Sequence, residues 1–141
     1  MSSLSTLLAE GLRPGVYRWP SAPAAPDVRR DAAAAGFGFV LLDTGEIHDK
    51  TGFLDLCATA FDLPRWFGRN WDALADSLSD RSTGAPEVVL WTGLRHLLDH
   101  DHDTVDVALQ IFAEDTTNSG QLRVLIVETK TPDLLSSLPV L

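Results

Sequence analysis

Three aspartates recur every four residues in WFGRNWDALADSLSD, the stretch from Trp66 to Asp80. If this stretch is helical, Asp72, Asp76 and Asp80 share one face, because each step of four residues advances about 40° beyond a full turn. Like charges at this spacing repel by roughly 0.2–0.5 kcal/mol per pair, and the helix contains no Lys or Arg to offset them. Such a face offers carboxylate oxygens for charge-assisted hydrogen bonds to a cationic group.

The neighbouring residues predict the helix that positions these carboxylates. Asn70 is a favourable N-cap, and Asp72 then falls in the first turn, where the helix dipole favours an anion. Leu74 and Leu78, together with Trp71, lie on the side opposite to the aspartates. The pattern therefore predicts an amphipathic helix with one apolar face and one almost purely acidic face.

Two aromatic residues, Trp66 and Phe67, precede this helix in a segment that contains Gly68. Because loops lie at the surface, we expect at least one of these rings to be exposed. A solvated face is the simplest interpretation of the aspartates, but such faces usually mix positive and negative charges. Exposed aromatic rings beside carboxylates favour a protein interface instead.

The run from Leu63 to Leu78, LPRWFGRNWDALADSL, resembles the second-helix region of the barstar family, which are intracellular inhibitors of barnase-type ribonucleases. The shared pattern is Leu-Pro, two aromatic residues, G-x-N, an apolar residue, D-A-L and an Asp four positions after the first. A turn like TGEI, the strand EVVLW and QIFAE before a last strand recur in the same order. The resemblance covers roughly Gly36 to Glu128.

The resemblance implies an inhibitor that inserts its second helix and the preceding loop into the cationic active site of a guanyl-preferring ribonuclease. It implies that Asp76 is the main anchor, at the position of the substrate phosphate, and that Trp66 packs on the catalytic histidine. Asp72 corresponds to a second contacting carboxylate. The predicted partner-binding residues are Trp66, Phe67, Arg69, Asn70, Asp72, Ala73, Asp76, Ser79, Asp80 and Glu114.

The sequence departs from the barstar pattern at four positions. Ala75 and Arg81 stand where the family has tryptophan, Arg69 replaces an acidic residue and Ser77 replaces a cysteine. These differences keep the aspartates and change the residues around them. They bear on which ribonuclease is the target more than on the mode of binding.

Three apolar runs predict the framework of the fold. Strands near 38–43, 88–92 and 122–128 are apolar on both faces and separated by helical patterns. This alternation is typical of an α/β fold with a mainly parallel sheet. The resemblance likewise implies a small three-stranded parallel sheet packed with helices.

The chain divides into three segments by the character of its sequence. We predict a barstar-like domain over residues 36–129. Residues 1–35 form an N-terminal extension, whose role is an added strand and helix, a dimer contact or a shield for a sheet edge. We expect residues 130–141 to be a C-terminal tail that is loose at its end.

Composition narrows the classes of partner and compartment. The chain has 141 residues and a net charge of −9, which argues against direct binding to nucleic acid or an anionic membrane and favours a basic partner. Its single cysteine, Cys57, excludes an internal disulfide. No segment approaches the roughly 20 apolar residues that span a membrane, and the N-terminus lacks signal-peptide features. We therefore expect a cytoplasmic protein and a basic, secreted ribonuclease as its partner.

A metal enzyme is the first alternative interpretation. His96 and His100 have the i, i+4 spacing of helical zinc ligands, and His102 lies nearby among aspartates. The glutamate of the HExxH motif is absent, and clusters of this kind on loops are usually solvated. We therefore predict that the protein is not an enzyme and that it has no metal ligands and no cofactor.

A second alternative retains the barstar fold and changes the partner. In that case the acidic face binds a basic protein that is not a ribonuclease. Such an interaction module would fail to protect RNA, and this difference separates it from an inhibitor.

Overall fold

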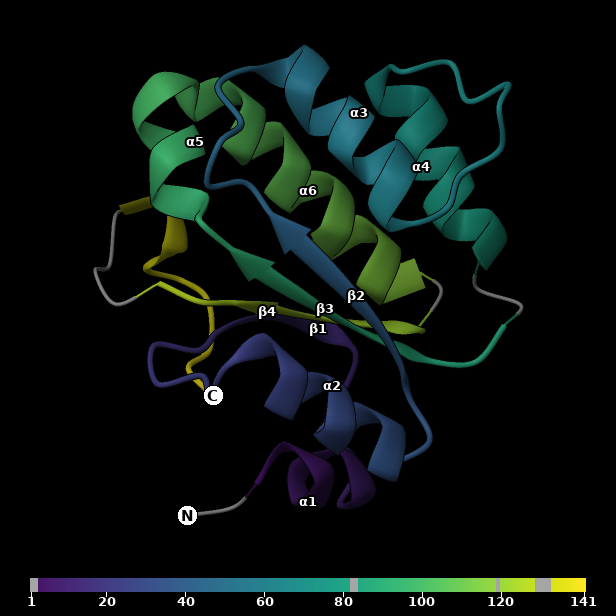
Figure 1. Ribbon diagram of the computed structural model, residues 1–141, viewed down its shortest axis with the longest axis vertical. Helices are drawn as coiled ribbons and strands as arrows, with labels where there is room; N and C mark the ends of the chain where they lie inside the picture. Colours follow the sequence, from purple (N-terminus) through teal and green to yellow (C-terminus); the bar gives the residue numbers. More distant parts are fainter. Residues whose placement is uncertain (1–2, 82–83, 119, 129–132) are drawn as a thin grey trace.

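The computed structural model describes residues 3–81, 84–118, 120–128 and 133–141. Four parallel strands form one sheet in the order β1-β4-β3-β2 (Figure 1). They are β1 (Gly15–Arg18), β2 (Gly38–Asp43), β3 (Glu87–Thr92) and β4 (Leu122–Ile126). The predicted α/β class, the parallel sheet and the three apolar strands are confirmed.

The strand β1 corrects the prediction of a three-stranded sheet. It pairs with β4 in parallel, with Gly15 opposite Arg123, so the N-terminal extension supplies a strand of the sheet. Only Val16 of β1 is buried, which explains why the apolar pattern of this strand is weak. Arg123 Nε also donates a hydrogen bond of 3.1 Å to the Leu12 carbonyl oxygen, which ties the approach to β1 onto β4.

Helices cover both faces of the sheet, as Figure 1 shows. One face carries α3 (Lys50–Ala60), α4 (Trp71–Asp80), α5 (Leu94–His100) and α6 (His102–Asn118), and the other carries α1 (Leu4–Ala9) and α2 (Ala25–Ala34). None of these helices, as far as the described residues extend, is long and apolar enough to cross a membrane.

Alternate residues of the central strands divide the core into two clusters. Val89 and Trp91 of β3 face the layer of α3 to α6, whereas Val88 and Leu90 face α1 and α2. The indole N–H of Trp91 donates a hydrogen bond of 2.9 Å to Thr44 Oγ1, so this fully buried ring leaves no polar atom unsatisfied. The acidic helix α4 thus belongs to a layer of helices that packs on one face of a buried sheet.

The C-terminal residues 133–141, predicted as part of a tail with a loose end, contact the rest of the fold. The 3-10 helix η2 (Asp133–Leu135) buries Leu135, and Val140 forms a bridge with Arg18 of β1. Arg18 N–H donates to the Pro139 carbonyl oxygen at 2.9 Å, and Leu141 N–H donates to the Arg18 carbonyl oxygen at 2.8 Å. These bonds pair the main chain of Arg18 at the end of β1. The first residues of the predicted tail, 130–132, lie outside the described ranges.

Candidate protein-binding site

The helix α4 begins where its sequence predicts. Asn70 is the N-cap, and its side-chain oxygen accepts a hydrogen bond of 2.8 Å from the Ala73 N–H. Leu74 and Leu78 are buried in the core, and Trp71 packs partly against it, with its ring centroid 5.9 Å from that of Phe53. This packing fixes the rotation of α4 and turns the acidic face outward.

The carboxylates of Asp72, Asp76 and Asp80 are all exposed to solvent. Within the described ranges, Asp72 and Asp76 form no ion pair. Arg69, three residues before Asp72, is directed to Asp55, with Nε 2.7 Å from Oδ1. Asp72 and Asp76 therefore present uncompensated negative charge, which water screens in the free protein.

The loop between α3 and α4 places the adjacent rings of Trp66 and Phe67 in different environments. Phe67 N–H donates to the Pro64 carbonyl oxygen at 2.9 Å, which closes a turn, and Arg69 follows with φ of 48°. Phe67 is only 6% exposed, whereas Trp66 is 84% exposed. The structure thus places Phe67 in the core as the anchor of the loop, and not at the surface where a partner contact was predicted. Trp66 is the ring that the loop presents to solvent.

A groove of about 390 Å³ lies between this loop and α4. It is lined by Trp66, Phe67, Ala73, Asp76, Asp80 and Arg81, among others. Three carboxylates, those of Asp62, Asp76 and Asp80, therefore border one concavity together with the exposed indole of Trp66. An arginine or lysine side chain fits this chemistry, because the carboxylates accept its hydrogen bonds and an indole face attracts its charge.

The remaining predicted residues differ in what they can contact. Ser79 is exposed on α4, and Glu114 is exposed on α6, which packs against α4. Ala73 is half-buried beside the groove. Asn70 and Arg69 are exposed, but their side chains are also engaged in the cap and the Asp55 ion pair.

Sequence reasoning left three polar residues of the groove, Asp62, Ser77 and Arg81, out of the predicted contacts. Asp62 lines it and has a positive φ of 51°, just after the end of α3. Ser77 lines it from α4, where the sequence marked it only as a departure from the family pattern. No signal in the sequence places Asp62 there, because its position depends on how the loop folds back against α4.

The only thiol of the chain belongs to the core and not to this site. Cys57 lies on the buried side of α3 and has no exposed surface. Burial raises the pKa of its thiol far above the ordinary value, because a thiolate would lose its solvation there. The reactive form of cysteine is the thiolate, so Cys57 is not a nucleophile in the folded protein.

A comparison with protein-family models matches residues 37–127 to the family described as barstar (barnase inhibitor). The match contains β2, β3, β4, the loop and α4, and it leaves out β1. A comparison with curated proteins found no match.

Proposed function

The chain belongs to the barstar family, and on this basis we propose that it is a cytoplasmic protein inhibitor of a small guanyl-preferring ribonuclease. The observation that carries the proposal is the groove in which exposed Trp66 and the carboxylates of Asp76 and Asp80 meet. These are the residue types that would fill a cationic, phosphate-binding active site. The partner is therefore a basic, secreted enzyme, and neither nucleic acid nor a membrane is bound directly.

Asp76 is the proposed anchor in that active site. It is exposed in the middle of the acidic face, with Asp72 one turn before it and Asp80 one turn after it. Its carboxylate would take the position of the substrate phosphate and accept charge-assisted hydrogen bonds from the cations of the enzyme. The inhibitor thus needs no reactive group, and we expect it to hydrolyse no RNA.

Trp66 supplies the apolar part of the proposed interface. Aromatic anchors on a rigid support contribute much of the binding energy of protein interfaces. The buried neighbour Phe67 and the turn to Pro64 hold the backbone of Trp66 in place, so little conformational freedom is lost on binding.

The two arginines that replace family residues act on the rim. Arg69 is paired with Asp55 across the loop, and Arg81 is paired with Glu87 at the opposite end of α4. Each guanidinium is paired with its own carboxylate, so neither arginine neutralises Asp72 or Asp76. We propose that they select among ribonucleases that share a cationic active site and differ around it.

An RNA-cleavage assay against a panel of small guanyl-preferring ribonucleases tests this function. We expect loss of cleavage at a ratio of one inhibitor to one enzyme, and recovery of cleavage when Asp76→Ala replaces the parent protein. A pancreatic-type ribonuclease of unrelated specificity is the control and should stay active. If every guanyl-preferring enzyme stays active in excess protein, the acidic face binds a basic partner of another class.

A further inference from the structure

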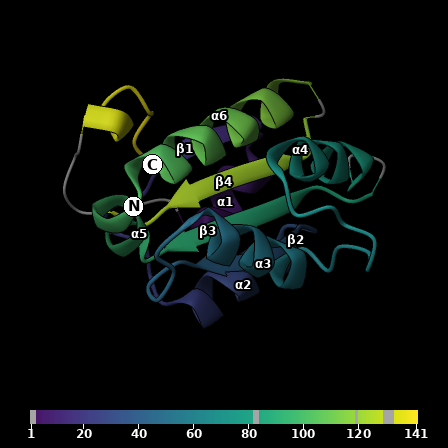
Figure 2. The ribbon, with the colours of Figure 1, turned by 90° about the horizontal axis from the view of Figure 1, so that it is seen from above.

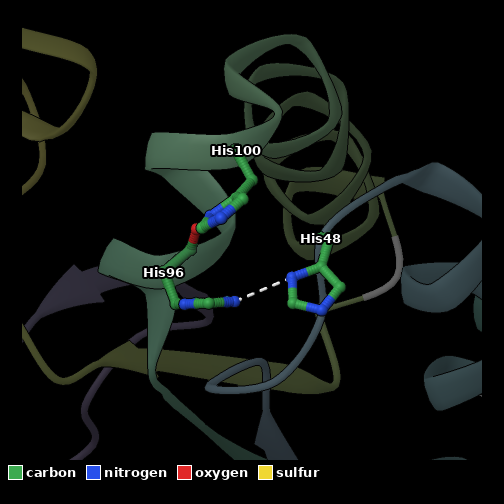
Figure 3. A group of neighbouring side chains, drawn as sticks. All are labelled: His48, His96 and His100. Carbon is green, nitrogen blue, oxygen red and sulfur yellow. Dashed lines mark hydrogen bonds between the residues drawn. The ribbon is translucent and has the colours of Figure 1, made fainter.

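Three histidines from two segments that are far apart in the sequence meet at one end of the sheet (Figure 3). His96 and His100 are on α5, and His48 lies in the connection between β2 and α3. One ring nitrogen from each of the three lies within 4.8 Å of the other two. His102, which the sequence placed in the same cluster, is not part of this group.

A close backbone contact brings the two segments together. Gly93 precedes α5 with φ of 70°, and a Cβ atom there would lie 2.4 Å from the backbone nitrogen of Gly45. Only glycine permits this approach, so the turn after β2 rests directly on the start of α5. The segment with His48 follows β2, and α5 follows β3. The ends of these two strands are paired, with Asp43 opposite Thr92, so the sheet sets the position of His48 relative to α5.

The hydrogen bonds within the group leave nitrogen lone pairs available. His96 Nε2 lies 2.9 Å from His48 Nδ1, so these two nitrogens share one hydrogen. His100 Nδ1 lies 2.8 Å from the His96 carbonyl oxygen, and since a carbonyl only accepts, Nδ1 carries the hydrogen and Nε2 the lone pair. A backbone carbonyl on the second ring nitrogen is the usual support of a metal-binding histidine.

We propose that His48, His96 and His100 bind one divalent transition-metal ion, with Zn²⁺ as the probe. Three neutral imidazoles are a ligand set that zinc accepts, and tetrahedral bonds of 2.0–2.1 Å place ligand nitrogens about 3.3 Å apart. The spacings in this group, from 2.9 Å to at most 4.8 Å, bracket that value. On binding, the hydrogen between His48 and His96 would move to the other nitrogen of its own ring, so both rings stay neutral. The two nitrogens would separate to about 3.3 Å, and water would complete the coordination. Mg²⁺ and Ca²⁺ prefer oxygen ligands and do not suit the site.

The metal site is separate from the proposed ribonuclease-binding face. Figures 1 and 2 both show α5 and α4 at opposite ends of the helical layer. His48 and His100 are exposed and His96 is partly exposed, so an ion can enter from solvent. This inference therefore holds whether or not the acidic face inhibits a ribonuclease.

Calorimetric titration of ZnCl₂ into chelator-treated protein tests the proposal. We expect saturable binding of one Zn²⁺ per chain and a rise in melting temperature with zinc, because the ion binds the folded state. MgCl₂ should produce neither effect. Wild-type protein that shows no saturable zinc binding would overturn the proposal.

Alanine variants locate the site. His48→Ala and His100→Ala should each weaken zinc binding at least tenfold, since even outer-shell partners of a metal contribute about 10–100-fold. His102→Ala is the matched control, because this exposed histidine lies just beyond α5 and outside the group. It should bind zinc like the wild type. Equal losses in His102→Ala and His48→Ala would show diffuse surface binding and overturn the assignment. Melting of each variant without zinc separates lost binding from lost folding.

Discussion

Arg81 and Glu87 form a two-pronged ion pair between the C-cap of α4 and the first residue of β3. Arg81 Nε donates to Glu87 Oε1 at 3.0 Å, and Nη2 donates to Oε2. Nη1 donates to the Phe61 carbonyl oxygen, and the guanidinium carbon lies 5.3 Å from the centroid of the Phe61 ring. The residue that borders the groove thus also connects α4 to the sheet and to the end of α3.

Arg81→Ala should lower the free energy of unfolding by about 1–3 kcal/mol, because it leaves the largely buried Glu87 carboxylate without its donor. The side chain of Glu87 is only 16% exposed. Urea unfolding monitored by tryptophan fluorescence measures the change. Arg30→Ala is the control, since its ion pair with Asp27 is well exposed, and it should cost about 0.5 kcal/mol or less. Similar losses in both variants would contradict a structural role for Arg81.

Asp76→Ala should weaken ribonuclease binding more than any other exposed change on α4, by at least about 2 kcal/mol. Asp72→Ala should weaken it less, and Asp80→Ala least, because Asp80 lies at the far end of the face. Stability should hold or rise in Asp76→Ala, since the change removes two repulsive i, i+4 pairs. Binding titrations and thermal melts on the three variants provide the comparison. An Asp76→Ala variant that binds like the parent, or fails to fold, would refute the anchor assignment.

Trp66→Ala and Phe67→Ala should have opposite consequences although the residues are adjacent. Phe67→Ala empties a core position and should destabilise the fold by about 3 kcal/mol. Trp66→Ala removes a solvent-exposed ring and should change stability by no more than about 0.5 kcal/mol, while weakening ribonuclease binding. Denaturation and binding assays on the pair measure both effects, and each variant is the control for the other. Unimpaired binding by Trp66→Ala would exclude this ring from the interface.

The association rate with the ribonuclease should fall as ionic strength rises from 0.01 to 0.1 M. Over this range the Debye length shortens from about 30 Å to about 10 Å, so the attraction between the acidic face and a basic enzyme is screened. Stopped-flow fluorescence measures this rate. The dissociation rate should change far less, because contacts inside the interface are poorly screened. A salt-independent association rate would contradict electrostatic steering.

Cys57 should resist thiol reagents at neutral pH until the protein unfolds. The raised pKa keeps the group as the unreactive thiol in the folded state, whereas unfolding restores the ordinary pKa and access to solvent. A colorimetric disulfide reagent should therefore detect one thiol per chain in denaturant and essentially none without it. Rapid labelling of the native protein would show that α3 opens readily.

The strands and the acidic helix could be predicted because each is recorded in a local pattern. The runs EVVLW and LRVLIVE are mainly apolar because both faces of the central strands β3 and β4 are buried. The run FGFVLLD is also mainly apolar, although β2 is an edge strand. The helix α4 is marked by its Asn70 cap and its opposed apolar and acidic faces. Patterns such as these can be recognised in the sequence without knowledge of contacts between distant residues.

The unpredicted features depend on contacts between distant residues. The sequence left an added strand in residues 1–35 as one alternative, but it did not indicate that Gly15 lies opposite Arg123. It could not decide which of Trp66 and Phe67 is buried, because a loop has no period. His48 joins His96 only because Gly93 lets two turns touch, and that contact spans 48 positions.

The strand order also determines when the sheet can be completed during synthesis of the chain. β1 is made first, yet it pairs with β4, whose Arg123 emerges more than one hundred residues after Gly15. β2 and β3 can pair earlier, with α3 and α4 between them, but one edge of β3 then stays without its neighbour. Closing so long a loop is slow, because its entropic cost precedes the contacts that repay it. The nascent chain must therefore keep the unpaired edges of β1 and β3 away from other chains until β4 inserts between these two strands.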